Sequence, residues 1–380
     1  FMLLSLALGL TAWYLHTGEL ENAAQKQEKI APVEASSEAP LSDLLTLDPI
    51  RLEVGYGFID LVESGRDGNL LDRLQAVRRQ IARDIGFVLP PVHIKDNLQL
   101  GVGEYRMLIR GADIGRCEIR PRNLLALKGQ QSGPEIEGIA TQEPAFGLPA
   151  LWIGNDMRQQ AELSGYTVVD PATVIVTHIT EMLRQNAHEI LDRAQVREML
   201  DNLSERHPKV VEDMVPAQVS HGLLQNVLQR LLAEWVPIRD LMAILETLAD
   251  HGANAGDVDA MVEHVRTRLG RSIVQQYLDT QGELKVFTLD PQLEQAMNER
   301  VAVQNGFSLP LDIQQWQRFA TQMTTCVSRH DVDVPVILTA PPLRAPLAHA
   351  LGRIMPRVAI LSVAEVPANI TVNPLEQVGL

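Results

Sequence analysis

The stretch EPAFGLPALWIGNDMRQQAELSGYTVVDPATVIVTHITEMLR, residues 143–184, decides the fold because it brings turn, strand and helix signals together. Within it, residues 148–153 form a short apolar run flanked by glycine and proline, which is typical of a buried strand. The β-branched run at residues 165–169 predicts a second strand. Strands that lead directly into a helix indicate an α/β arrangement for this part of the chain.

The helix of this stretch is expected to begin at Asp170 and Pro171. An aspartate side chain accepts hydrogen bonds from the free amides of a first turn, and proline is well tolerated at the first helical position. Ile175, Ile179 and Met182 recur at helical spacing and are expected to face the core. A different stripe of the same helix carries threonines: Thr173, Thr177 and Thr180.

Strand and helix signals continue on both sides of this stretch. Residues 191–269 are strongly helical, and Pro216 and Pro237 are expected to mark two helix starts. Residues 284–362 follow the order strand, helix, strand, helix, strand, which predicts a parallel or mixed sheet. Near the beginning, one amphipathic helix is predicted from apolar residues at helical spacing: Leu70, Leu74, Val77 and Ile81.

Composition limits the classes of partner. The 380 residues carry a formal net charge of -15, with a pI near 5.1, and 46% of them are apolar. This balance argues against nucleic acid or an anionic membrane surface as the main partner, because both require clustered lysine and arginine. The two cysteines, Cys117 and Cys326, are expected to be structural thiols of a reducing compartment.

The first residues have a different character from the rest. Residues 1–15 (FMLLSLALGLTAWYL) are apolar and end near Trp13 and Tyr14, which predicts the tail of a transmembrane helix whose beginning has been cut away. Residues 16–48 are acidic and rich in proline, serine and alanine, which predicts a flexible linker. One exception is a leucine cluster that is expected to dock on its own domain or on another surface: Leu41, Leu44, Leu45 and Leu47.

No motif in the chain predicts catalysis. The sequence contains no phosphate-binding G-x-x-x-x-G-K-[ST] loop, and Arg106 stands where a dinucleotide loop beginning at residue 101 would need its third glycine. His188-Glu189 lacks the second histidine of a zinc-protease helix, and neither cysteine has metal-ligand spacing. We therefore expect no enzymatic activity, no cofactor and no metal; a hydrolase with an unrecognised site is the enzymatic alternative.

Five further motifs occur in order: LEVGYGFIDLV from residue 52, DIGFVLPPVHIKDNLQL from 84, EYRMLIRGADIGR from 104, VPIRDLMAILETLADH from 236 and FTLDP from 287. Together with EPAFGLPALWI, they resemble the FlhA/SctV family, the export-gate proteins of bacterial type III secretion. The resemblance covers residues 48 to 380, and the EPAFGLPALWI wording is more similar to the flagellar branch than to the injectisome branch.

The resemblance implies a shallow apolar groove that receives complexes of export chaperones with their cargo. Carried over to this sequence, its residues are Glu143, Phe146 and Thr177. A large aromatic such as Phe146 is not needed to build a turn, which favours a role as a binding anchor. The alternative is that Phe146 fills its own core, because large apolar residues are usually buried.

The resemblance also implies a non-enzymatic docking platform in the cytoplasm, attached to a channel in the bacterial inner membrane. It implies a ring of nine subunits, and the leucine cluster would then dock on a neighbouring subunit. The implied partners are chaperone–cargo complexes of the FlgN, FliS and FliT type, the ATPase complex and a second gate component, with no nucleic acid. The alternatives are an injectisome export gate and a ring scaffold that makes no contact with cargo.

The expected fold is α/β and α+β with several domains, in four compact subdomains that follow the truncated membrane helix and the acidic linker. One subdomain is helical and the others contain mixed sheets. The expected boundaries are 1–15 for the membrane helix, 16–48 for the linker, 49–121 with 171–190 for subdomain 1, 122–170 for the inserted subdomain 2, 191–270 for the helical subdomain 3, 271–366 for subdomain 4 and 367–380 for a C-terminal tail.

Overall fold

The chain divides into two units, Phe1–Asp48 and Pro49–Leu380, and the second contains all the helices and strands given below. The computed structural model describes residues 47–58, 70–129, 133, 136–252, 256–304, 309, 311–330, 332 and 334–379, without the side chains of 302–304. Within these ranges, no helix is long and apolar enough to cross a membrane.

Most of the N-terminal predictions lie outside the described residues. This is the case for the membrane helix expected at residues 1–15, for the linker up to residue 46, and for Leu41, Leu44 and Leu45. Leu47 is described, and 61% of it is exposed.

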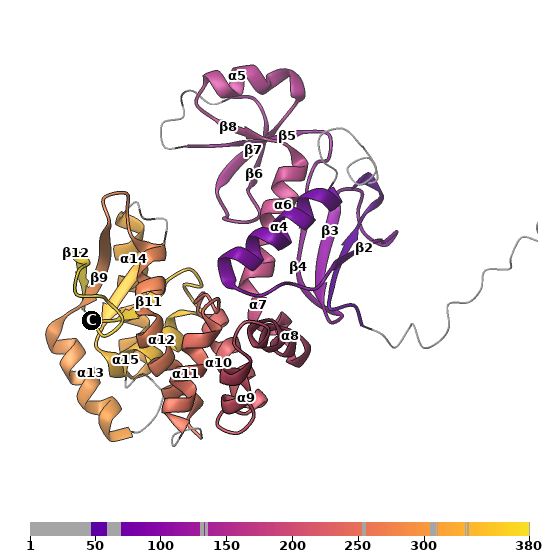
Figure 1. Ribbon diagram of the computed structural model, residues 1–380. Helices are drawn as coiled ribbons and strands as arrows, with labels where there is room; N and C mark the ends of the chain where they lie inside the picture. Colours follow the sequence, from indigo (N-terminus) through magenta and orange to yellow (C-terminus); the bar gives the residue numbers. More distant parts are fainter. Residues whose placement is uncertain are drawn as a thin grey trace, which may run out of the picture. The chain divides into compact units, whose positions relative to one another are not determined.

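The first sheet is mixed and has the strand order β2-β1-β3-β4. β1 runs parallel to β2 and antiparallel to β3. Two helices, α4 and α6, pack against each other beside this sheet and share its apolar core (Figure 1). The predicted stripe of α4 is confirmed, since all four of its residues are buried. The elements are β1 (Ile50–Val54), η1 (Tyr56–Phe58), α4 (Leu70–Ile85), β2 (Val92–Asp96), β3 (Glu104–Ile109), β4 (Ala112–Glu118) and α6 (Pro171–Gln185).

A second sheet is inserted between β4 and α6, with the order β6-β7-β5-β8 and only antiparallel pairs. It has a small core of its own, in which Tyr166 packs with residues of β5 and β7. The two strands expected in this stretch are confirmed, with β7 and β8 close to the predicted positions. The elements are β5 (Leu124–Leu127), β6 (Ile139–Gln142), β7 (Pro149–Ile153), η2 (Asn155–Met157), α5 (Arg158–Leu163) and β8 (Thr167–Val169).

A helical region follows α6. The predicted helix starts at Pro216 and Pro237 are wrong, because α10 and α11 begin several residues later, behind the side-chain caps of Ser220 and Asp240. These caps accept backbone amides of the first turn, which a proline cannot do. The elements are α7 (Ala187–Ile190), α8 (Arg193–Ser204), α9 (Pro208–Met214), α10 (His221–Ala233), α11 (Leu241–Asp250), α12 (Val258–Val274) and η4 (Gln275–Tyr277).

The last sheet is entirely parallel, with the order β11-β10-β9-β12. The prediction of a tail at residues 367–380 is corrected by the structure. Residues 371–378 form strand β12, which pairs with β9 along its length. Backbone hydrogen bonds to β9 and the burial of Val378 hold this strand in the sheet. The elements are β9 (Glu283–Leu289), α13 (Pro291–Gln304), α14 (Ile313–Arg329), β10 (Val336–Thr339), α15 (Pro341–Leu351), β11 (Ala359–Ser362) and β12 (Thr371–Val378).

Buried charges join this last sheet to the helical region. Arg266 of α12 and Arg344 of α15 are 2% and 1% exposed. Arg266 donates through Nε and Nη2 to Glu365, at 3.1 and 2.9 Å, and through Nη1 to Glu234 at 3.0 Å. Arg344 pairs with Glu234 and with Glu263. We call these five residues the ionic junction.

The mixture of sheets and helices confirms the predicted α/β and α+β class with several domains. The two cysteines are both free, as expected.

Candidate functional site

The turn at residues 143–148 connects β6 to β7 and carries two of the three predicted site residues. Its ends are closed by a hydrogen bond from the Glu143 amide to the Leu148 carbonyl, at 2.8 Å. The Gly147 amide donates to the Glu143 carbonyl at 2.8 Å. Gly147 has φ 70°, a left-handed conformation that a residue without a side chain adopts at little steric cost. We call this segment the docking turn.

Glu143 lies inside the docking turn and is only 4% exposed. Its Oε1 accepts from the Ala145 amide at 2.9 Å, and its Oε2 accepts from the Phe146 amide at 2.6 Å. A buried carboxylate needs such partners, and here they are the amides of its own turn. Through these two hydrogen bonds, Glu143 fixes the shape of the turn.

Phe146 does not fill a core, because 47% of it is exposed. Leu148, at the end of the same turn, is 46% exposed. Ile139, at the start of β6, is 50% exposed. The β6–β7 hairpin therefore presents three large apolar side chains that this chain buries only in part.

Arg357 contacts the docking turn from the segment between α15 and β11, and sequence analysis missed it. Its guanidinium carbon lies 4.3 Å from the centre of the Phe146 ring, a cation–π arrangement. Its Nη2 donates to the Ala145 carbonyl at 3.0 Å and to Glu181 at 3.2 Å. No local pattern links residues more than 200 positions apart, so the sequence held no signal for this contact.

Thr177, the third predicted residue, is half-buried on α6. The predicted start of this helix is confirmed, since Asp170 caps it by accepting from the Thr173 amide at 2.9 Å. Glu181 lies one turn after Thr177, on the same side of the helix. The structure thus connects this side of α6 to the docking turn through the Arg357–Glu181 pair, rather than through Thr177 itself.

Beside this site, Tyr105 and His178 form a hydrogen bond of 2.7 Å between the phenol oxygen and Nδ1. Burial lowers the pKa of His178 below its usual 6.5, against the opposing charge of Glu181. Burial, with Cys117 and Glu143 nearby, raises the pKa of Tyr105 well above its usual range. Burial also raises the pKa of the Cys117 thiol. At neutral pH this group is therefore an uncharged hydrogen-bonded pair beside a protonated thiol.

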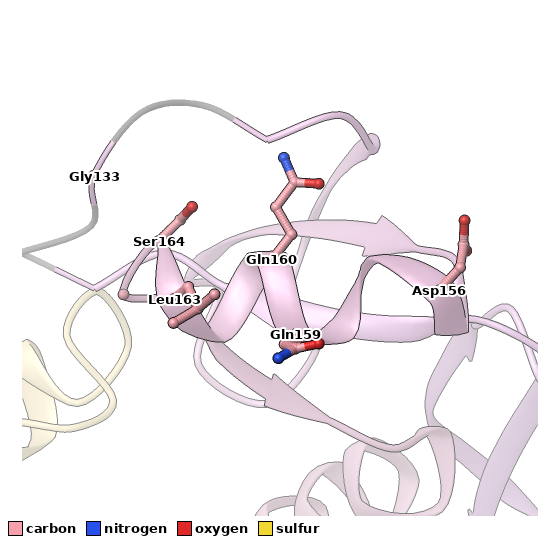
Figure 2. Close-up of a pocket in the computed structure, with 7 residues that line it drawn as sticks. Gly133, Asp156, Gln159, Gln160, Leu163 and Ser164 are labelled. Atoms are coloured by element: carbon pink, nitrogen blue, oxygen red, sulfur yellow. The ribbon is translucent and has the colours of Figure 1, made fainter.

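A separate open depression of about 800 Å³ lies beside α5, and Figure 2 shows its lining. Leu163, which is 82% exposed, contributes its apolar part, and Asp156 is the ionisable residue among those that line it. None of the predicted site residues belongs to it. Its lining residues are Gly133, Asp156, Gln159, Gln160, Leu163, Ser164 and Gly165.

Within the described part of the chain, no group of three or more histidine, cysteine, aspartate or glutamate residues is placed to hold a metal ion. The docking turn itself brings apolar and cationic groups together. It combines an aromatic ring and an aliphatic side chain with one guanidinium.

Comparison with known proteins places this chain in a family. The chain is 36% identical over 383 residues to the flagellar biosynthesis protein FlhA of Yersinia enterocolitica, which covers 100% of this chain and 55% of that protein. It therefore spans about half the length of this relative. Two solved structures share the fold. The CdsV protein of Chlamydia pneumoniae has a TM-score of 0.74 at 23% sequence identity, and the match covers 87% of this chain and 98% of that one. Nonameric EPEC SctV-C has a TM-score of 0.69 at 20% sequence identity, with 87% of this chain and 98% of that one covered.

A family model described as the FHIPEP family matches residues 1–371 of this chain. The resemblance inferred from the sequence motifs is confirmed by this match and by the FlhA relative. The chain belongs to the FHIPEP family.

Proposed function

We propose that this chain is a non-enzymatic docking platform of a flagellar type III protein export gate, which binds chaperone–cargo complexes and passes the cargo to a membrane channel. The observation that carries this proposal is the docking turn, in which a buried acid holds a half-exposed phenylalanine outward. Membership of the family and the similarity to a flagellar FlhA support the flagellar assignment.

The physical basis of docking is the apolar surface that the turn leaves in contact with water. Complete burial of a large apolar side chain contributes roughly 1.5–3 kcal/mol, and Phe146 and Leu148 each have about half of that still to gain. Aromatic residues at the centre of an interface are frequent hot spots. A partner that lays the apolar face of an amphipathic helix on the turn would use this surface.

The assembly and location of the platform are part of the same proposal. We place it in the cytoplasm beneath the inner membrane, as one of nine subunits of a ring, with the ATPase complex and a second gate component as further partners. The nonameric state of a protein with the same fold supports the ring. The exposed Leu47 is consistent with a linker segment that docks on a neighbouring subunit.

The proposal is tested by calorimetric titration of the 380-residue chain with a FliS-type chaperone bound to its cargo, from the same source. Phe146→Ala is expected to weaken binding at least tenfold, because the anchor is lost. Its thermal unfolding is expected to stay close to that of the wild type, because the side chain is half-exposed. The matched control is Leu163→Ala, which removes an equally apolar and more exposed side chain from α5 and is expected to bind normally.

Two results would contradict the proposal. One is absence of binding by the folded wild-type chain, which favours a ring scaffold without cargo contact. The other is a large loss of thermal stability in Phe146→Ala with unchanged affinity, which would make this residue a packing element. Binding of injectisome chaperones in place of flagellar ones would move the chain to the other branch of the family.

A further inference from the structure

Arg357 is held in place by the docking turn, although it belongs to the C-terminal sheet region. The Phe146 ring lies against its guanidinium, the Ala145 carbonyl accepts from it, and Glu181 of α6 balances its charge. Its side chain is nevertheless 37% exposed. A charged group that is both immobilised and accessible is suited to recognition, because little rotational freedom remains to be lost when a partner binds.

The hydrogen bonds of Arg357 leave part of the guanidinium available. Both bonds start from Nη2, and within the described residues Nε and Nη1 donate to no protein group. An arginine has five N–H donors in a planar fork, and a carboxylate can accept two of them side by side. The partly exposed side chain therefore offers a fixed cation with free donors next to an apolar anchor.

The acids beside this cation are already engaged. Glu143 is buried and accepts two amides of the docking turn, and Glu181 is only 12% exposed and accepts from Arg357 and from Gln185. Of these three ionised side chains, the one that a partner can reach is thus the cation, in a chain whose net charge is -15. An acidic group on the partner is the complement of this site.

We propose that Arg357 is the charged member of the docking surface. The partner helix offers it a carboxylate three or four residues from the apolar side chain that packs on Phe146. This spacing follows from geometry, since the guanidinium lies 4.3 Å from the ring and residues three or four apart on a helix have their Cβ atoms about 5–6 Å apart. The inference rests on the proposed function and specifies which helices the docking turn accepts.

The experiment compares Arg357→Gln with Arg353→Gln in the same titration with a FliS-type chaperone and its cargo. Arg353 lies in the same segment, is exposed, and makes no contact with the Phe146 ring, so it controls for the loss of one positive charge. Arg357→Gln is expected to weaken binding about tenfold and to reduce its dependence on salt, whereas Arg353→Gln is expected to bind like the wild type. Arg357→Lys is expected to lie between them, because it keeps the charge without the fork.

Alanine variants of the acids on the chaperone helix then identify the carboxylate. One of them is expected to be non-additive with Arg357→Gln and additive with Arg353→Gln. Thermal unfolding of every variant shows that the fold is retained.

Unchanged or tighter binding of Arg357→Gln overturns the inference; tighter binding would mean that Arg357 shields Phe146. If the wild type binds and Phe146→Ala does not, such a result leaves the proposed function intact. Absence of binding by the wild type overturns both.

Discussion

Among the residues that the structure describes, two groups of arginine contacts that differ in burial, the ionic junction and Arg357, connect the C-terminal sheet region to other parts of residues 49–380. At the ionic junction, Arg266 and Arg344 are 2% and 1% exposed and are held by three carboxylates. At the docking turn, Arg357 is 37% exposed and has a single carboxylate partner. Arginine therefore has two roles in this chain: it forms buried ion pairs at the ionic junction and a partly exposed contact at the docking turn.

This difference in burial indicates which of the two sets of ion pairs is easier to separate. Removing one partner of a buried ion pair leaves an uncompensated charge in a medium that solvates it poorly. The Arg357–Glu181 pair is less costly to separate than a fully buried pair, because solvent reaches and screens Arg357. We infer that the ionic junction has a structural role inside the fold, whereas Arg357, held beside the docking turn, remains available to a partner.

The largest expected effect separates these two classes of arginine. Arg344→Ala is expected to lower the free energy of unfolding by about 3–5 kcal/mol, because Glu234 and Glu263 lose a buried cation. Arg357→Ala is the partly exposed counterpart and is expected to lower it by about 1 kcal/mol, because solvent reaches Arg357 although Glu181 is only 12% exposed. Urea denaturation of both variants measures the difference, and equal losses would remove the distinction drawn here.

A smaller effect is expected from the close approach at Gly270 of α12. A Cβ added there would lie 2.2 Å from the Glu365 carbonyl oxygen, so α12 or the Glu365 segment has to move. Gly270→Ala is expected to destabilise the fold by about 1–3 kcal/mol. Gly222→Ala in α10 is the matched control, because nothing lies within 4 Å of its added Cβ. It is expected to be neutral or stabilising by up to about 1 kcal/mol in the same denaturation assay.

The smallest effect is a dependence on pH. Burial tends to raise the pKa of Glu234, but Arg266, Arg344 and Arg230 outweigh burial and lower it below the usual 4.5. A carboxylate whose pKa is lower in the folded state stabilises the fold when the pH is above its pKa in the unfolded state. This stabilisation is lost as the pH falls through its pKa in the folded state. As the pH falls from about 6 to about 3, the melting temperature of the wild type is expected to fall more steeply than that of Glu234→Gln. Parallel curves would mean that Glu234 gains nothing from its partners.

Local patterns predicted much of the fold. The apolar stripe of α4 and the cap of α6 are local features, since they depend on residues within one or two turns, and both are confirmed. Strand β12 lies where a tail was expected, and it contains Pro374, a residue type that the interior of most strands excludes. Proline is tolerated in an edge strand at a bulge, and the register of β12 shifts between Pro374 and Glu376. That tolerance depends on pairing with β9, which lies some ninety residues away and leaves no local signal.

The candidate site residues Glu143, Phe146 and Thr177 were predicted from the resemblance to the family, not from local patterns. The turn-forming neighbours of Phe146 favoured a binding anchor over the alternative of a core residue, and its 47% exposure agrees with the anchor. Sequence alone did not reveal that Glu143 would be occupied by the amides of its own turn, since that requires the turn to be built. Arg357 was out of reach because only the tertiary fold brings it to the ring.

The hydrogen bonds inside the docking turn have a kinetic consequence. Because Glu143 already fixes the amides of Ala145 and Phe146, a partner that lands on the ring meets a shape that exists before the encounter. No slow rearrangement of this segment has to precede capture, so association rates should vary little among partners of similar charge. Differences in affinity among such partners should then be set by how long each complex lasts.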